Sequence, residues 1–228
     1  MLQGPYTLPG FLYPQPRYDF KSNTDAPEVE PGANVFVFTE LVRLTASLAP
    51  RLVCQTGFNY GASAVAFLCN TGVDATVYSF DLGEHRYLQI GWELIDLRFG
   101  ERHGLVFGDS SQTLAQARGA APFAYNENLP KSRCDLAYVD GGHSFEAAYG
   151  DIANFRVLSR PNATVVVDDC HYPIDVDTTN HWEGVPRAYA AAVEDGIIIH
   201  ERQFATNACN GYWNSRFCSR LCIGRFSG

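Results

Sequence analysis

The stretch "RLVCQTGFNYGASAVAFLCN", residues 51–70, places an apolar run, a turn with two glycines and a run of small residues in direct succession. The apolar run at 51–56 is typical of a buried β-strand, and the run at 61–70 is typical of a helix. Gly57 and Gly61 lie between the two and let the backbone of the turn approach a ligand closely. The stretch therefore predicts a strand, a ligand-binding turn and a helix.

The same alternation of apolar runs and helical patterns continues along the chain. We expect further strands at 76–81, 104–109, 135–140 and 164–169, and further helices at 34–50, 86–99, 110–118 and 144–159. Strands that alternate with helices of this length form βαβ units, which predicts an α/β fold with a parallel sheet covered on both faces. Ligands of such folds bind outside the carboxyl ends of the strands.

Aspartates end four of the five expected strands. They are Asp81, Asp109, Asp140 and Asp168, and Asp169 follows the last of them. A single aspartate at the end of a strand is commonly a helix cap or a turn former. Several carboxylates at one edge of a sheet repel one another, so the pattern indicates a cationic or hydrogen-bond-donating ligand there.

Length and charge limit the classes of partner. The chain has 228 residues, of which 46% are hydrophobic, and we expect a proline- and aromatic-rich arm at 1–32 followed by one domain at 33–228. The arm could serve as a linker, a lid or the strap of a homo-oligomer. The formal charge of −8 argues against a nucleic-acid partner, and no apolar run reaches the length of a membrane span. A small molecule or a neutral glycan is the expected partner.

The cysteines do not show the dense, even spacing of a disulfide framework. There are seven, an odd number, and several lie beside apolar runs: Cys54, Cys69, Cys134 and Cys170. We therefore expect reduced thiols and a cytoplasmic protein. Cys209, Cys218 and Cys222 could form a zinc site with His200, but the paired C-x-x-C spacing of such sites is missing, and buried thiols are favoured.

The turn after the first expected strand lacks the G-x-G-x-x-G pattern of nicotinamide oxidoreductases. It resembles instead the first motif of the class I S-adenosylmethionine-dependent methyltransferases, an acidic residue followed by x-Gly-x-x-x-Gly, with Gln55 in place of the acid. "YSFDLGEH" (78–85) and "FGDSSQTL" (107–114) are similar to the second and third motifs. The resemblance implies a Rossmann-like, doubly wound, mostly parallel seven-stranded sheet, with Asp81 at the ribose and Asp109 and Ser110 near the adenine. The cofactor-binding residues that it implies are Gln55, Gly57, Asn59, Gly61, Ser63, Asp81, Asp109 and Ser110.

Two later motifs make the resemblance narrower. "CDLAYVDGGHSFEAAYGDI" (134–152) and "VVVDDCH" (165–171) resemble the metal-dependent small-molecule O-methyltransferases, particularly the branch with the macrolide-sugar and cephalosporin-biosynthesis enzymes. This branch implies Mg²⁺ or Mn²⁺ bound by Asp140, Asp168 and Asp169, with Asp140 and His143 as the catalytic residues and His143 as the general base. Carboxylate oxygens suit these hard ions better than they suit zinc. His171 is a second candidate for the base.

The sequence leads us to expect metal-assisted methyl transfer from S-adenosylmethionine to a hydroxyl of a sugar or glycan. A bound metal lowers the pKa of a hydroxyl, and a histidine can accept its proton near neutral pH. Trp182, Tyr189 and Tyr212 could stack on a sugar or could be core residues. Three alternatives stay open: a catechol- or phenol-type O-methyltransferase, a methyltransferase or cofactor-binding protein without metal-dependent activity, and an oxidoreductase. His143 could also cap the helix at 144–159, although Ser144 could do so instead.

Overall fold

The computed structural model of the chain describes residues 35–85, 87–117, 133–172, 183–205 and 220–228. The expected arm at 1–32 lies outside these ranges, as do Trp182, Cys209, Tyr212 and Cys218. The helices are α1 (Val35–Leu48), α2 (Ala62–Asn70), α3 (Leu88–Phe99), α4 (Ser110–Ala117), α5 (Phe145–Leu158) and α6 (Gly184–Glu194), with a 3₁₀ turn at Gly100–Arg102. The strands are β1 (Leu52–Thr56), β2 (Thr76–Asp81), β3 (His103–Phe107), β4 (Cys134–Val139), β5 (Ser159–Val167), β6 (Ile198–Ala205) and β7 (Arg220–Phe226).

The described strands form one seven-stranded sheet in the order β3-β2-β1-β4-β5-β7-β6. Strands β1 to β5 are parallel, and β7 pairs antiparallel with both β5 and β6. The chain reverses its direction of winding between β3 and β4, so β1 and β4 are neighbours. This confirms the predicted doubly wound, mostly parallel sheet. Its switch point, between β1 and β4, is where such folds open a crevice for ligands.

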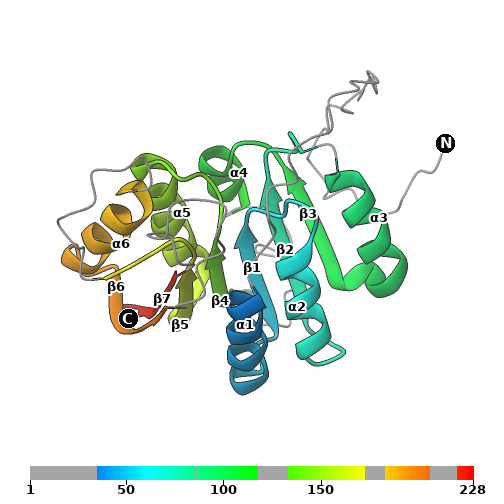
Figure 1. The fold of residues 1–228 in the computed structure, drawn as a ribbon, viewed down its shortest axis with the longest axis horizontal. Coiled ribbons are helices and arrows are strands. Elements are labelled where there is room, and N and C mark those ends of the chain that lie inside the picture. Colours follow the sequence, from blue (N-terminus) through cyan, green and yellow to red (C-terminus); the bar gives the residue numbers. More distant parts are fainter. Residues whose placement is uncertain (1–34, 86, 118–132, 173–182, 206–219) are drawn as a thin grey trace.

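Helices cover both faces of the sheet (Figure 1). One core contains Leu41 of α1, Phe67 of α2 and Ile95 of α3 together with strand residues such as Val53. The other contains residues of α4, α5 and α6 together with the next residue of β1, Cys54. Successive residues of a strand face opposite sides, so β1 contributes to both cores, and its five residues are all buried.

In the first two thirds of the chain, the observed boundaries of helices and strands agree closely with those predicted from the sequence. The main difference is β5, which begins at Ser159 rather than at residue 164, because Ser159 already pairs with Cys134 of β4. Helix α6 and the antiparallel strands β6 and β7 were not predicted as individual elements. The run of His200, Glu201, Arg202 and Gln203 in β6 has no apolar alternation, because β6 is an edge strand with polar side chains in solvent.

The prediction of reduced cysteines was wrong for four of the seven. Cys54 and Cys134 form one disulfide, and Cys170 and Cys222 form another. Cys54 and Cys134 are 80 residues apart in sequence, but their strands β1 and β4 lie side by side in the sheet. Cys222 lies in β7 beside β5, and Cys170 follows β5 closely. The zinc alternative, which the sequence already disfavoured, therefore loses Cys222, because a disulfide sulfur is not available as a thiolate ligand.

Candidate functional site

The turn between β1 and α2 lies against the end of β4. Gly57 has φ +78°, a conformation that side chains disfavour, and a Cβ atom added there would collide with the carbonyl oxygen of Asp140. Gly61 has φ +92°, and its Cβ would lie 2.5 Å from the Ile95 side chain of α3. Both glycines are therefore required by the close approach of neighbouring segments. The turn brings the predicted cofactor loop next to the predicted metal ligand Asp140.

Asp81 at the end of β2 fixes the conformation of this turn. Its Oδ2 atom accepts hydrogen bonds from the backbone N–H groups of Phe58 (2.7 Å) and Asn59 (3.0 Å). Its Oδ1 atom accepts one from Gly83 at 2.7 Å. Oδ1 has capacity for a further donor, such as a ribose hydroxyl. The carboxylate thus has a position at the ends of β1 and β2 that suits the predicted role, and it also orders the loop.

Gln55 is the next-to-last residue of β1. Its side chain is fully buried, and its Nε2 donates to Ser79 Oγ at 2.8 Å. Ser79 Oγ also contacts His103 Nε2 at 2.9 Å, and burial lowers the pKa of His103 to about 4. Gln55 is therefore part of a neutral polar ladder across β1, β2 and β3. An acidic residue at this position would be a buried charge without a cationic partner in the ladder.

The remaining predicted cofactor residues lie in, or just before, the first turns of α2 and α4. Asn59 lies in the β1–α2 turn with φ +53°, and Ser63 is 7% exposed in α2. Asp109 Oδ1 accepts a hydrogen bond from the Ser111 N–H at 2.8 Å, and hydrogen bonds from Ser111 lower the pKa of Asp109. Asp109 is therefore a cap of α4, and Ser110 is the first residue of that helix.

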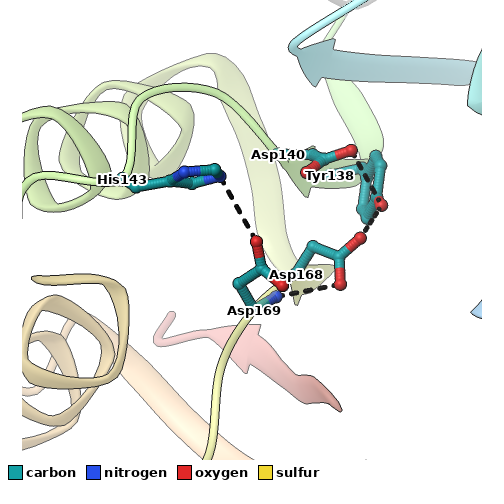
Figure 2. A network of polar contacts seen from close by, with 5 residues as sticks. All are labelled: Tyr138, Asp140, His143, Asp168 and Asp169. Carbon is teal, nitrogen blue, oxygen red and sulfur yellow. Dashed lines mark hydrogen bonds and ion pairs between the residues drawn. The ribbon is translucent and has the colours of Figure 1, made fainter. Parts of the chain in front are cut away.

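Tyr138, Asp140 and Asp168 form a cluster where β4 and β5 end (Figure 2). The Tyr138 hydroxyl donates to Asp168 Oδ2 at 2.6 Å and lies 3.2 Å from Asp140 Oδ2. The other oxygen of Asp168 accepts a hydrogen bond from the Asp169 N–H at 2.9 Å. The two aspartates come from neighbouring strands, and the phenol joins them.

The electrostatic state of this cluster favours a positive ligand. Burial, and then the charges of Asp168 and Asp169, raise the pKa of Asp140 well above its ordinary value. Burial and the charge of Asp169 raise the pKa of Asp168 to about 7, although the hydrogen bond from Tyr138 opposes this rise. Carboxylates gathered in this way either take up protons or bind a cation.

His143 faces Asp169 rather than the two buried aspartates (Figure 2). Its Nε2 lies 3.3 Å from Asp169 Oδ2, and the two side chains are 44% and 41% exposed. Asp169 has φ +51°, a left-handed conformation that aspartate tolerates and that redirects the chain after β5. The cap of α5 is Ser144, whose Oγ accepts from the Ala147 N–H at 3.1 Å. His143 is therefore not required as a helix cap.

The predicted metal ligands fit a hard cation in chemistry but are not gathered around one point. Three carboxylates at the ends of two adjacent strands are the donor type that Mg²⁺ and Mn²⁺ prefer. Across the described ranges, however, no three His, Cys, Asp or Glu side chains converge closely enough to hold a metal ion as they stand. The reason lies in two contacts: Asp169 is turned to His143, and the Tyr138 hydroxyl lies between the other two aspartates.

Asp151 of α5 is a polar residue that the sequence analysis did not identify. Its side chain is 1% exposed, and burial raises its pKa to about 6. A Cβ atom at Gly141 would lie 3.0 Å from its Oδ2, and the hydroxyls of Thr56 and Ser110 face it and oppose the rise in pKa. Neither carboxyl oxygen has a partner at full hydrogen-bond geometry. The sequence does contain a signal for this residue, because Asp151 interrupts the apolar face of the helix formed by Ala148, Ile152 and Phe155.

Two further candidates have other roles. Tyr189 is fully buried in α6, and its hydroxyl contacts His200 Nδ1 at 2.9 Å, so it is a core residue and not a platform for a sugar. His200 is thereby in contact with α6, and Cys209 and Cys218 of the zinc alternative lie outside the described residues. His171 follows Cys170, which is fixed by its disulfide to β7.

Residues 54–170 match a protein family described as a methyltransferase domain. The chain belongs to this methyltransferase family. The matched segment runs from β1 through the turn after β5, so it includes the glycine turn, Asp81 and the carboxylate cluster. No curated protein matches the sequence.

Solved structures of methyltransferases have the same fold as this domain. An O-methyltransferase from Bacillus cereus in complex with S-adenosylhomocysteine is 15% identical, with a TM-score of 0.64, and the match covers 85% of this chain and 82% of that one. The O-methyltransferase TomG from Streptomyces achromogenes, in complex with S-adenosylmethionine, is 14% identical with a TM-score of 0.63, covering 86% and 82%. The N-methyltransferase NodS from Bradyrhizobium japonicum, in complex with S-adenosylhomocysteine, is 15% identical with a TM-score of 0.59, covering 86% and 90%. The methyltransferase fold thus accommodates both oxygen and nitrogen acceptors.

None of the described helices is long and apolar enough to cross a membrane. Reduced cysteines were one argument for the expected cytoplasmic location, and the two disulfides remove that argument. The location stays a prediction.

Proposed function

We propose that the protein transfers the methyl group of S-adenosylmethionine to a hydroxyl of a sugar or glycan, assisted by a divalent cation. The observation that carries the proposal is the cluster of Asp140, Asp168, Asp169 and His143 beside the Gly57 turn. The cofactors bound by the structurally similar B. cereus and TomG enzymes support S-adenosylmethionine as the methyl donor.

The cofactor would lie across the ends of β1, β2 and β3. The Gly57–Gly61 turn offers backbone that a ligand can approach closely, and Asp81 Oδ1 has capacity to accept from a ribose hydroxyl. Ser110, the first residue of α4, would lie near the adenine end. In this arrangement the carboxylates at the end of β4 would lie on the acceptor side of the cofactor.

A hydroxyl acceptor suits this cluster better than an amine. An alcohol becomes a competent nucleophile only as it loses its proton, and a histidine that is 44% exposed can accept that proton at Nε2. Asp169 would stabilise the protonated imidazole, because the two groups are already 3.3 Å apart. Asp140, Asp168 and Asp169 would hold Mg²⁺ or Mn²⁺, which as a Lewis acid lowers the pKa of a nearby hydroxyl.

The sugar acceptor is supported by the match of "DGGH" and "VVVDDCH" to the sugar-modifying branch. A formal charge of −8 disfavours polyanionic acceptors such as nucleic acids. A catechol or phenol is the second candidate, since the same carboxylate cluster would bind a cation beside either kind of hydroxyl.

The proposal is tested by mass spectrometry of methylated products with S-adenosylmethionine and two acceptor panels, neutral sugars and catechols. We expect transfer to sugars that EDTA abolishes and Mg²⁺ or Mn²⁺ restores. Full activity in EDTA would exclude the metal, and methylation of catechols alone would assign the protein to the phenol branch. Calorimetry with S-adenosylhomocysteine in EDTA separates a loss of activity from a loss of cofactor binding.

The role of His143 needs its own variant. His143→Ala should retain S-adenosylhomocysteine binding and lose about 10²–10⁴-fold in turnover, the usual contribution of a positioned base. His171→Ala is the matched comparison, because it removes the other histidine near the cluster. Turnover that falls in His171→Ala and not in His143→Ala would reassign the base.

A further inference from the structure

Asp151 places a carboxyl group in the apolar core beneath α5. Its side chain is 1% exposed, and its neighbours on the inner face of the helix are Ala148, Ile152 and Phe155. Burial raises its pKa to about 6, and neither carboxyl oxygen has a partner at full hydrogen-bond geometry. A buried carboxyl group without such partners destabilises a fold. An apolar side chain would suit this core better, so packing does not account for the carboxyl group.

Three segments of the ligand-binding edge meet at this carboxyl group. Thr56 is the last residue of β1 and directly precedes the Gly57 turn. A Cβ atom on Gly141, in the loop after β4, would lie 3.0 Å from Asp151 Oδ2 and 3.2 Å from Thr56 Oγ1. Ser110 begins α4, and its hydroxyl also faces the carboxyl group. The turn after β1, the loop after β4 and the start of α4 therefore come together around Asp151.

The two hydroxyl groups suit an ionised carboxylate. Each can donate one proton, and the carboxylate has two oxygens that accept. The hydroxyls of Ser110 and Thr56 oppose the rise in the pKa of Asp151 that burial causes, so they stabilise its charged form, whereas the charge of Asp109 acts against that form. Thr56 Oγ1 is itself buried without a partner at full geometry, so a hydrogen bond between the two side chains satisfies both of them.

We propose that Asp151 is a positioning residue for the cofactor: its carboxylate accepts from Thr56 and Ser110 and so holds the Gly57 turn at a fixed distance from the start of α4. This inference rests on the proposed function, because it takes these two segments as parts of the site for S-adenosylmethionine. With an exposed fraction of 1%, Asp151 acts through the two hydroxyl-bearing residues and does not contact the cofactor. The role accounts for a carboxyl group that the core by itself disfavours.

The test is the affinity for S-adenosylhomocysteine, measured by isothermal titration calorimetry at pH 8, where Asp151 is ionised. Thr56→Val removes the hydroxyl and keeps the shape of the side chain, and Asp151→Ala removes the acceptor. Each should bind roughly 3–10-fold more weakly than wild type, the usual contribution of one hydrogen bond. The double variant should bind no more weakly than Asp151→Ala, because both substitutions remove the same interaction. Thr56→Ser keeps the hydroxyl and should bind as wild type does.

Thr45→Val is the matched control, because it removes another buried threonine hydroxyl, one that donates to the Leu41 carbonyl within α1. It should bind S-adenosylhomocysteine with the affinity of wild type. An equal loss in Thr45→Val would assign the effect to general packing and overturn the inference.

The remaining outcomes are also decisive. Wild-type affinity in Thr56→Val and Asp151→Ala, whatever their stability towards urea, would overturn the inference and leave the proposed function intact. Additive losses in the double variant, or equal losses in Thr56→Val and Thr56→Ser, would overturn it as well. If Asp151→Ala does not fold, the comparison of the two Thr56 variants decides. A wild-type protein that does not bind S-adenosylhomocysteine would overturn the proposed function itself, and this inference with it.

Discussion

At the scale of single residues, the aspartates at the strand ends divide into distinct roles. Asp109 caps a helix and Asp81 orders a turn, whereas Asp140 and Asp168 share a phenol at the end of the sheet. All of them follow buried strands, so their sequence context is the same. What separates them is the set of donors that the fold places around each carboxylate.

Asp81→Ala should weaken S-adenosylhomocysteine binding by roughly 1–3 kcal/mol. The substitution removes the acceptor for a ribose hydroxyl and the two hydrogen bonds that hold Phe58 and Asn59. Isothermal titration calorimetry measures the loss, and Asp74→Ala, an exposed aspartate before β2, is the control. An unchanged affinity would count against the placement of the cofactor.

Asp151 should make stability depend on pH. Burial raises its folded-state pKa from 3.8 to about 6, so the folded protein holds a proton that the unfolded chain has already lost in this range. Its contribution to the unfolding free energy is therefore present below pH 4, falls as the pH rises to about 6, and then stays constant. The fall is roughly 3 kcal/mol.

Asp151→Asn should remove this part of the pH dependence, as urea denaturation at pH 4, 5, 6 and 7 would show. Glu146→Gln, on the exposed side of the same helix, should keep the slope of the wild type. Because Asp140 and Asp168 contribute equally to all three proteins, the difference between variants isolates Asp151. Identical slopes in wild type and Asp151→Asn would contradict the prediction.

At the scale of elements, local sequence patterns were sufficient to predict a strand where that strand is buried on both faces of the sheet. Three residues are apolar in each of the runs at 52–56, 76–81 and 103–107, and strands of a covered parallel sheet are rich in such residues. The edge strand β6 carries consecutive polar residues and has no such signal. The residues of the site also differ in how well the sequence predicted them. Asp140 and Asp168 were predicted because they follow strands with a clear sequence pattern. Tyr138 was missed because nothing local distinguishes its hydroxyl from that of another core tyrosine.

Ser144→Ala should lower the unfolding free energy by about 1 kcal/mol, because it removes the acceptor for the Ala147 N–H at the start of α5. Urea denaturation measures the change. The control is Ser47→Ala, at an exposed position near the end of α1, which should be close to neutral. If the two serine variants are equally stable, the cap does not stabilise the helix.

At the scale of the whole molecule, the order of the strands determines which distant residues meet. The site combines the turn after β1 with the ends of β4 and β5 because the switch in winding places β1 beside β4. The same neighbourhood joins Cys54 to Cys134, and the antiparallel return of β7 joins Cys222 to Cys170. Cysteine spacing along the chain contains no information about strand order. Disulfides were therefore beyond the reach of the sequence, although Cys54, Cys134 and Cys170 were correctly placed beside apolar runs.

The two disulfides should contribute strongly to stability. They close segments with sequence separations of 80 and 52 residues, and loop-closure entropy predicts about 4 kcal/mol for each. The Cys54→Ser/Cys134→Ser and Cys170→Ser/Cys222→Ser variants should each unfold at a lower urea concentration than wild type. Cys69→Ser should not, because Cys69 is an exposed free thiol. Iodoacetamide labelling of the urea-unfolded, non-reduced protein, followed by mass spectrometry, checks which cysteines are oxidised. Cys54, Cys134, Cys170 and Cys222 should stay unlabelled until a reductant is added. Complete labelling without reductant would contradict the disulfides and support the reduced thiols that the cysteine spacing predicted.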